Sequence, residues 1–267
     1  MIETKDDLIG APLMKTRTLL FTTWLLISSA LAHAAPTQQL PSAYPVRQLS
    51  PQLQVQQLAA GLWLHRTEQR LSNGAVFTAN GLILETPDGI WLLDTAWGFY
   101  PTRDLLHWID VVLKKPVRKA IATHAHDDRT GGVVALAERG IPLQVTTQTG
   151  AIAAEQQIAP LQVVTDLAPG GVYQDGPVQW FYPGPGHTVD NIVLWLPQYQ
   201  LLHGGCFVKA PRYPGLGNIA DADVAAWPVS LQRLKAQYPQ ALVVVPGHGN
   251  VGDLQLLDYS LALFSKR

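Results

Sequence analysis

The stretch Thr123–Gly132, THAHDDRTGG, places two histidines and two aspartates within five positions and then ends in paired glycines. A short apolar run typical of a buried strand precedes it, and the apolar residues after the glycines predict a helix. His124, His126 and Asp128 stand two residues apart. In an extended or looping segment, this spacing turns alternate side chains to one side. Three groups that can bind a metal therefore converge at the end of a strand.

Taken alone, the same stretch also fits a polar surface loop in which Asp128 or Thr130 caps the following helix. Three other segments weaken that alternative, because each brings a further metal-binding side chain to a strand end on a glycine-rich turn. They are YPGPGHTVDN with His187, LLHGGCFVK with Cys206 and VVVPGHGN with His248. Four such turns in one chain indicate a metal site.

The candidate ligands are of three kinds that zinc accepts, namely imidazole, carboxylate and thiolate. They are His124, His126, His187, Asp128, Cys206 and His248. A catalytic zinc ion has three protein ligands and one position for water, so six ligands suit two zinc ions. The spacing is unlike that of a zinc finger or ribbon, in which cysteines come in close pairs.

The composition limits the classes of function. Of the 267 residues, 47% are hydrophobic, which is enough for a sizeable core in one large domain or two small ones. Lys and Arg number 19 against 20 Asp and Glu, which gives a net charge of −1. This balance argues against a nucleic-acid-binding protein and against a polybasic protein of the membrane surface. We expect a small-molecule substrate instead.

The N-terminus has the pattern of an export signal. A basic start at Met14–Arg17 is followed by an apolar run over 19–31 and by the triplet AHA, which has the small-x-small form of a cleavage site. The apolar run is shorter than the ~20 residues of a transmembrane helix, which makes a membrane anchor the weaker alternative. Residues 1–13 are acidic and fit no signal, so Met14 is an alternative start.

We therefore predict an export leader over 1–34, cleaved near Ala34, a partly ordered Pro-, Gln- and Ser-rich segment over 35–54, and one domain over 55–267. Export would carry the mature chain to the periplasm, where the lone Cys206 cannot form an internal disulfide. Such a thiol is either an inert buried side chain or a metal ligand.

Strand and helix patterns alternate along this domain, and some strands are linked by hairpins. Predicted strands cover 61–66, 77–84, 90–94, 119–123, 178–182, 192–196 and 241–245, and a further strand ends just before Cys206. Predicted helices cover 100–115, 132–139, 223–237 and 254–264. The pattern indicates an α/β protein in which helices cover the outer faces of sheets.

A set of short motifs resembles the metallo-β-lactamases, specifically their first zinc-dependent subclass. The motifs are NGLI at 80–83, LDTAWG at 93–98, HAHDDR at 124–129, GHTVDN at 186–191, GGCFVK at 204–209, GNIADAD at 217–223 and PGHG at 246–249. The resemblance covers about residues 55–265. It implies a four-layer αββα sandwich with the site along one edge.

The resemblance also implies a role for each ligand. His124, His126 and His187 would hold one zinc ion, and Asp128, Cys206 and His248 would hold the other. Asp94 and Arg129 would orient Asp128 and the cysteine loop, or would form a buried structural ion pair; the two roles can coincide. Trp97 would form the floor of the site or belong to the core.

The implied function is zinc-dependent hydrolysis of the β-lactam amide of penicillins, cephalosporins and carbapenems, which would confer antibiotic resistance. A zinc-bound hydroxide would attack without a covalent intermediate, and Asp128 would guide a proton. Asn218 would donate a hydrogen bond to the substrate, Phe77 would make apolar contact, and Lys209 would bind the carboxylate unless it is an exposed loop charge. We expect a periplasmic monomer with no nucleic-acid or membrane partner.

Two other classes of function stay open. Thioesterases and nucleases of the wider superfamily typically carry H-x-H-x-D-H and a bridging aspartate, where this chain has Arg129 and Cys206. A non-catalytic periplasmic zinc-binding protein would keep the ligands without hydrolysis. The presence of Lys209 and Asn218 argues against both alternatives.

Overall fold

The computed structural model describes residues 44–72 and 74–265. The predicted export leader and the first residues after it lie outside these ranges. Among the described residues, no helix combines the length and the apolar character needed to cross a membrane.

The first sheet has eight strands in the order of the chain. They are β1 Val46–Ser50, β2 Leu53–Ala59, β3 Leu62–Arg70, β4 Val76–Thr86, β5 Gly89–Leu93, β6 Val117–Ile121, β7 Leu143–Thr146 and β8 Gln162–Thr165. The strands from β1 to β5 pair antiparallel, and those from β5 to β8 pair parallel. The predicted hairpin is confirmed, since Thr86 pairs with Gly89 across the Pro87–Asp88 turn.

The second sheet has five strands in the reverse order of the chain, from β13 to β9. They are β9 Val172–Asp175, β10 Val178–Phe181, β11 Val193–Leu196, β12 Leu201–Gly205 and β13 Val243–Pro246. Only β12 and β13 pair parallel. These two strands therefore end at the same edge of the sheet, which brings the cysteine turn and the PGHG turn together.

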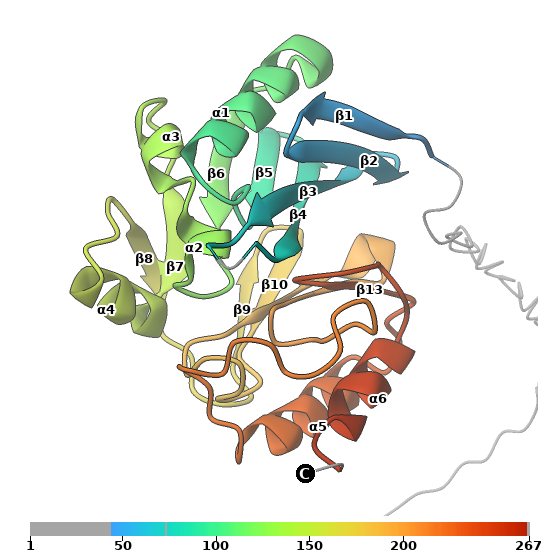
Figure 1. The fold of residues 1–267 in the computed structure, drawn as a ribbon. Helices are drawn as coiled ribbons and strands as arrows, with labels where there is room; N and C mark the ends of the chain where they lie inside the picture. The colour runs from blue at the N-terminus through green and yellow to red at the C-terminus, as the bar shows by residue number, and fades with distance from the viewer. Residues whose placement is uncertain (1–43, 73, 266–267) are drawn as a thin grey trace, which may run out of the picture. The chain divides into compact units, whose positions relative to one another are not determined.

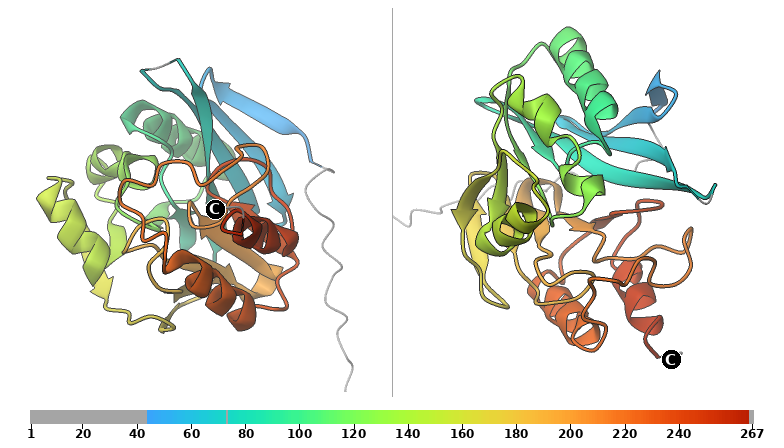
Figure 2. Two further views of the ribbon diagram at one scale, coloured as in Figure 1. Left: turned by 60° about the horizontal axis from the view of Figure 1, so that its bottom comes forward. Right: turned by 60° about the vertical axis from the view of Figure 1, so that its left-hand side comes forward.

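Helices cover the outer face of each sheet (Figures 1 and 2). The helices are α1 Phe99–Trp108, which continues into a π-helical turn over Ile109–Leu113, α2 Asp127–Thr130, α3 Val133–Ala137, α4 Thr147–Glu155, α5 Trp227–Gln237 and α6 Gln255–Ala262. In Figure 1, α1 and α3 lie on the first sheet, and α5 and α6 lie on the second.

Three apolar clusters join these layers. One lies between the two sheets and includes Leu82 and Trp180. Another lies between the first sheet and α1 and includes Leu92 and Leu105, and the third joins the second sheet to α5 and α6. Strand β5 (GIWLL) has no exposed residue because it is covered on both faces. The predicted four-layer αββα arrangement is confirmed.

The ordered sheet begins earlier than the predicted domain boundary. Residues 46–54, which we had placed in a partly ordered segment, form β1 and the start of β2. Leu53, Val55 and Leu58 of β2 are buried. The polar glutamines between them hid this strand, although apolar residues at alternate positions were its signal. The elements β1, β2, β7, β8, β9, α2 and α4 were not predicted.

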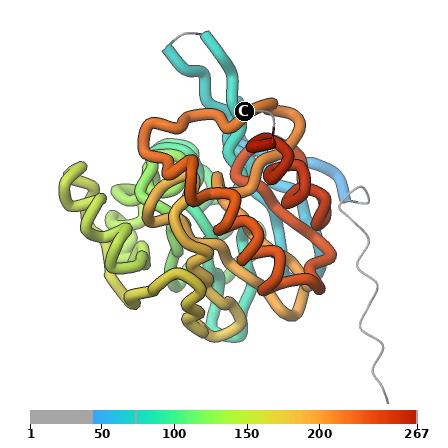
Figure 3. Tube along the Cα trace, turned by 90° about the horizontal axis from the view of Figure 1, so that it is seen from below, coloured from blue at the N-terminus to red at the C-terminus, as the bar shows by residue number. Residues whose placement is uncertain are grey.

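Two loops border the edge of the sandwich that carries the site. The hairpin between β3 and β4 projects from the body of the domain, and the loop after Cys206 passes beside it (Figure 3). A contact joins the two, since Tyr213 Oη lies 3.1 Å from the backbone nitrogen of Thr78 and 3.2 Å from its hydroxyl.

Candidate metal centre

The loop after β6 turns into a helix sooner than its sequence predicted. The helix α2 begins at Asp127, and the carbonyl of His126 accepts hydrogen bonds from the backbone nitrogens of Arg129 and Thr130. Neither Asp128 nor Thr130 caps the helix that follows the paired glycines, because the N-cap of α3 is Gly132 and no side chain caps it. The prediction of one extended segment is therefore wrong beyond His126.

Three histidines form the first group of candidate ligands. The ring centroids of His124, His126 and His187 lie 4.7, 5.0 and 5.1 Å apart in pairs. His187 Nε2 lies 3.2 Å from His126 Nδ1. Burial holds the pKa of His124 and of His187 well below the usual value, so both are neutral imidazoles. Neither ring nitrogen of buried His124 has a hydrogen-bond partner among the described residues, which fits a side chain that binds a metal ion.

Asp128, Cys206 and His248 form the second group. Sγ of Cys206 lies 3.2 Å from Asp128 Oδ2 and 3.1 Å from His248 Nε2, and these two atoms lie 3.1 Å apart. Bond lengths of about 2.0–2.3 Å to a tetrahedral zinc imply ligand separations of about 3.3–3.7 Å, close to these values. His248 Nδ1 donates to the carbonyl of Thr78 at 2.8 Å, which leaves Nε2 as the ligand atom.

The second group has a negative field that favours a cation. Burial alone would lower the pKa of His248, but its close contacts with Cys206 and Asp128 outweigh burial and raise that pKa to about 10. In the absence of metal, His248 is therefore protonated at neutral pH. A metal ion takes the place of this proton, so we expect metal binding to release protons.

The ligand atoms of His124, Asp128 and Cys206 also lie within 4.8 Å of one another, so the two groups adjoin. We assign His124 to the group of histidines, because its Nε2 lies 4.0 Å from the nearer oxygen of Asp128. His248 Nε2 lies 3.1 Å from both Cys206 and Asp128 and is the better third member of their group.

Arg129 holds the second group in place. It is fully buried, and its Nη2 donates to Asp128 Oδ2 at 2.8 Å and to Cys206 Sγ at 3.1 Å. Its Nη1 donates to Asp94 Oδ2 at 3.0 Å. Burial would raise the pKa of Asp94, but Arg129 and His203 hold it below the usual value. The ion pair of Asp94 and Arg129 is buried and also contacts two candidate ligands through Arg129 Nη2.

Glycines allow the cysteine turn and the PGHG turn to touch. A Cβ atom at Gly247 would lie 2.6 Å from the backbone nitrogen of Cys206 and 2.9 Å from Arg129 Nη2. Gly205, just before the cysteine, has φ of 51°, which favours glycine. The carbonyl of Gly205 accepts a hydrogen bond from Gly247 at 2.6 Å.

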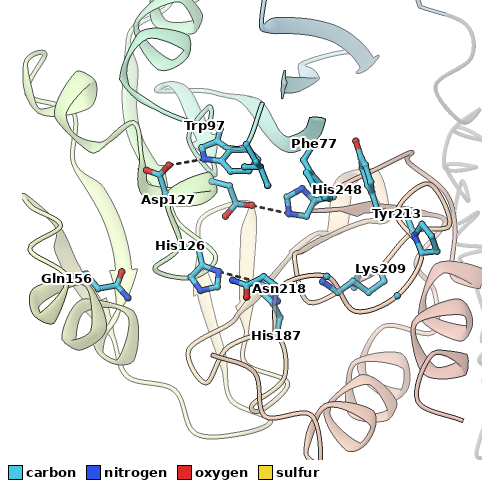
Figure 4. A pocket seen from close by; sticks show the side chains of 17 residues that line it. Phe77, Trp97, His126, Asp127, Gln156, His187, Lys209, Tyr213, Asn218 and His248 are labelled. Carbon is cyan, nitrogen blue, oxygen red and sulfur yellow. Dashed lines mark hydrogen bonds and ion pairs between the residues drawn. The ribbon is translucent and has the colours of Figure 1, made fainter. Parts of the chain in front are cut away.

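Both groups contribute to the wall of one cavity of about 670 Å³, His126 and His187 from the first group and Asp128 and His248 from the second. Figure 4 shows His126, His187 and His248 facing the same space as Lys209. The wall is Leu71, Phe77, Trp97, His126, Asp127, Asp128, Gln156, His187, Val208, Lys209, Ala210, Tyr213, Pro214, Gly215, Gly217, Asn218 and His248.

Comparison with known proteins agrees with this site. The family described as the metallo-beta-lactamase superfamily matches residues 74–248. The chain belongs to the metallo-β-lactamase superfamily. A metallo-beta-lactamase type 2 of Bacillus sp. (strain 170) is 43% identical over 79% of this chain and 82% of its own length. That of Bacteroides fragilis is 34% identical over 79% of this chain and 85% of its own length.

Solved structures give the same result. The metallo-beta-lactamase from Pontibacter korlensis is 40% identical, with a TM-score of 0.75 over 81% of this chain and 100% of its own. That of Erythrobacter litoralis is 31% identical, with a TM-score of 0.78 over 84% of this chain and 100% of its own. The chain is therefore a hydrolase of the metallo-β-lactamase type, a family that implies zinc, and the His, Asp and Cys ligands fit that ion.

Trp97 and Phe77 both lie in the wall of the metallo-β-lactamase cavity. Trp97 donates from Nε1 to Asp127 Oδ2 at 2.8 Å, and its ring lies 6.3 Å from that of His248. Phe77 stacks on Tyr213, with their centroids 5.0 Å apart. Trp97 is half-buried and faces the cavity, so it is not simply part of the core.

Lys209 and Asn218 line the same cavity. Lys209 is 9% exposed, and its ammonium lies 5.0 Å from the ring centroid of Trp227. It forms no ion pair with the described residues, so its charge is available to an anionic ligand. Burial lowers the pKa of Lys209. Asn218 is exposed and accepts the backbone N–H of Ala220 at its amide oxygen, which leaves its amide nitrogen as a donor.

Several residues at the metallo-β-lactamase site were not predicted from the sequence, among them Asp127, Tyr213 and His203. Asp127 adjoins a ligand, and His203 precedes Cys206 by three positions on β12. Nearness to a ligand in the sequence was the available signal for these two residues. Tyr213 gave no signal, because its contacts with Phe77 and Thr78 join segments far apart in the sequence.

Proposed function

We propose that this metallo-β-lactamase hydrolyses the cyclic amide of penicillins, cephalosporins and carbapenems at a centre of two zinc ions. The observation that carries this proposal is one cavity whose wall combines members of both groups of candidate ligands with the ammonium of Lys209, which forms no ion pair with the described residues. The two groups would hold the ions, and the ammonium would hold the carboxylate found beside the ring nitrogen of β-lactams. The named activity of the relatives supports the same reaction.

Zinc, when bound, supplies a water activated for attack and a positive charge that stabilises oxyanions. No covalent intermediate with serine is expected, because no serine stands in an S-x-x-K or G-x-S-x-G context. The water that the ions would activate is the proposed nucleophile, and the two groups of candidate ligands would hold the ions beside the substrate.

The residues of the chain position the substrate and move its proton. Lys209 binds the carboxylate, and the amide nitrogen of Asn218 donates to the carbonyl oxygen. Trp97 and Phe77 supply apolar walls. Asp128 is ionised, since Arg129 holds its pKa well below the usual value despite burial. Its Oδ2 is engaged by three partners, so Oδ1 is the atom that guides a proton to the leaving nitrogen.

The test is a panel of substrates with the purified, zinc-loaded protein. A penicillin, a cephalosporin and a carbapenem are compared with a thioester and a phosphodiester. Hydrolysis of each substrate is followed by absorbance and by the mass of the product. We expect turnover of the β-lactams and at least 100-fold lower kcat/KM for the other two, about 2.7 kcal/mol in transition-state stabilisation. Preferred hydrolysis of the thioester or phosphodiester, or no hydrolysis at all, would replace this proposal by one of the alternatives.

Replacing Lys209 by Ala should lower kcat/KM for β-lactams by about 10- to 100-fold. A charge-assisted hydrogen bond contributes about 1.5–3 kcal/mol, and each 1.4 kcal/mol is about tenfold. The loss should lie mostly in KM if the contact is equally strong in the ground and transition states. Steady-state kinetics measure both constants.

Arg212, three positions further along the same loop, provides the matched control. It is exposed and lies over the ring of Tyr213. Arg212→Ala should leave KM near the wild-type value. If Arg212→Ala raises KM while Lys209→Ala does not, the anchor is Arg212; if neither changes it, the loop does not bind the carboxylate.

We further propose that the protein is a periplasmic monomer that confers β-lactam resistance, with residues 1–34 removed on export. The basic start and the apolar run after it support this. The mass of the protein from the periplasmic fraction of an expressing bacterium should correspond to a chain that begins near Ala35. Recovery of the uncleaved chain from the membrane fraction would favour an anchor instead.

A further inference from the structure

A histidine outside the two ligand groups holds the carboxylate that supports Arg129. His203 lies on β12 and is fully buried. Its Nε2 lies 2.7 Å from Asp94 Oδ2, and since an ionised carboxylate only accepts, Nε2 carries the proton and donates it. The two residues stand 109 positions apart, so this hydrogen bond joins the second sheet to the first.

Asp94 needs such support because its backbone is strained. Its φ is 64°, in the left-handed region that costs a non-glycine residue free energy and persists only where the surroundings enforce it. Thr123 donates to its carboxylate from the backbone nitrogen at 2.7 Å and from the hydroxyl at 3.0 Å. His65 lies 3.2 Å from its backbone carbonyl. Several contacts hold Asp94 in this strained conformation beside the site. This indicates that the position of its carboxylate matters for function.

The position of this carboxylate determines that of Arg129. Asp94 Oδ2 accepts from His203 and from Arg129 Nη1 at 3.0 Å. The guanidinium is a rigid plane, so fixing Nη1 also fixes Nη2. Nη2 is the atom that donates to the ligands Asp128 and Cys206, at 2.8 and 3.1 Å.

We propose that His203 is a positioning residue for the group Asp128, Cys206 and His248. Its hydrogen bond fixes the carboxylate of Asp94, this carboxylate orients Arg129, and Arg129 sets the separation of the carboxylate and thiolate that one zinc ion requires. His203 acts only through these residues. The inference rests on the zinc centre proposed above but not on the substrate that the centre hydrolyses.

The test measures zinc affinity at each position by competition with a chromophoric chelator. His203→Phe keeps a buried ring but removes the donor, and should weaken one of the two zinc ions by about 10- to 100-fold, the usual effect of losing a group that orients a ligand. The other ion should bind as in the wild type. In the cobalt-substituted enzyme, the thiolate-to-cobalt absorption should weaken in parallel.

Two variants separate positioning from stability. His203→Gln keeps a donor at a similar reach and should restore most of the zinc affinity. Leu202→Ala, the neighbouring position on β12, removes a fully buried side chain whose contacts lie in the cluster against α5 and α6. It should lower the melting temperature and leave both zinc affinities unchanged. If His203→Phe does not fold, His203→Leu replaces it, and the same loss of zinc affinity is expected.

Unchanged zinc affinities in a folded His203→Phe or His203→Leu would overturn the inference. Equal losses in Leu202→Ala, or no recovery in His203→Gln, would also overturn it, because His203 would then act through stability alone. A wild-type enzyme that binds two zinc ions but opens no β-lactam would refute the proposed function. The zinc affinities of the His203 variants would still test the role of His203.

Discussion

Removing zinc with a chelator should abolish β-lactam hydrolysis, and adding zinc should restore it. Without the ion, the cavity contains no nucleophile of comparable strength, because zinc lowers the pKa of bound water from about 15.7 to about 7. It also loses several kcal/mol of charge stabilisation, and each 1.36 kcal/mol is about tenfold in rate, so we expect a fall of roughly 1,000-fold or more. Initial rates before chelation, after chelation and after zinc addition measure the effect.

Two controls accompany this experiment. Circular dichroism should show that the chelated protein stays folded, since the clusters between the four layers do not depend on the ion. The serine-directed inhibitor clavulanate should leave the rate unchanged. Full activity in a sample whose zinc has been reduced to a trace by elemental analysis would rule out zinc as the source of catalysis.

Cys206→Ser should remove one zinc ion selectively and lower kcat/KM by about 100-fold or more. A serine hydroxyl stays protonated at neutral pH, so the second group would lose a negative charge and the soft ligand that zinc accepts. The thiol sulfur lies within 3.2 Å of both other ligands and within 3.1 Å of Arg129 Nη2, so no neighbouring side chain can replace it without moving. Losing several kcal/mol of metal-derived stabilisation corresponds to a fall of this size.

The matched variant is Cys206→Asp, which replaces one anionic ligand by another. It should retain more zinc than Cys206→Ser and keep more activity. The metal content of both variants and the wild type is compared by elemental analysis, with melting temperatures as the check on folding. Two tightly bound zinc ions in Cys206→Ser would show that the thiol is not a ligand.

The sequence was sufficient to predict the candidate ligands that the structure brings together and most of the strands and helices that carry them. His124, His187, Cys206 and His248 each stand on a glycine-rich turn directly after or between apolar strands, and both features are local in the chain. Some strands were missed because their apolar pattern is weak. Strand β2 was hidden by glutamines between its apolar residues, and the short strands β8 and β9 have no fully buried residue.

The grouping of the ligands was predicted from family resemblance, and its geometry comes from the tertiary structure. Asp128 and Cys206 are 78 positions apart, and no pattern in either segment specifies that they meet. The alternation within the first motif favoured one group of His124, His126 and Asp128. Instead, the helical turn that begins at Asp127 directs Asp128 to Cys206 and His248.

The residues that position Asp128, Cys206 and His248 could not be predicted from the sequence. His203 contributes through a hydrogen bond to Asp94 that crosses from one sheet to the other. A local sequence pattern predicts on which side of a strand or turn a side chain lies, because this depends on a few neighbouring residues. Which of those side chains meet is decided by how two sheets pack on a shared apolar core, and that depends on the whole domain at once.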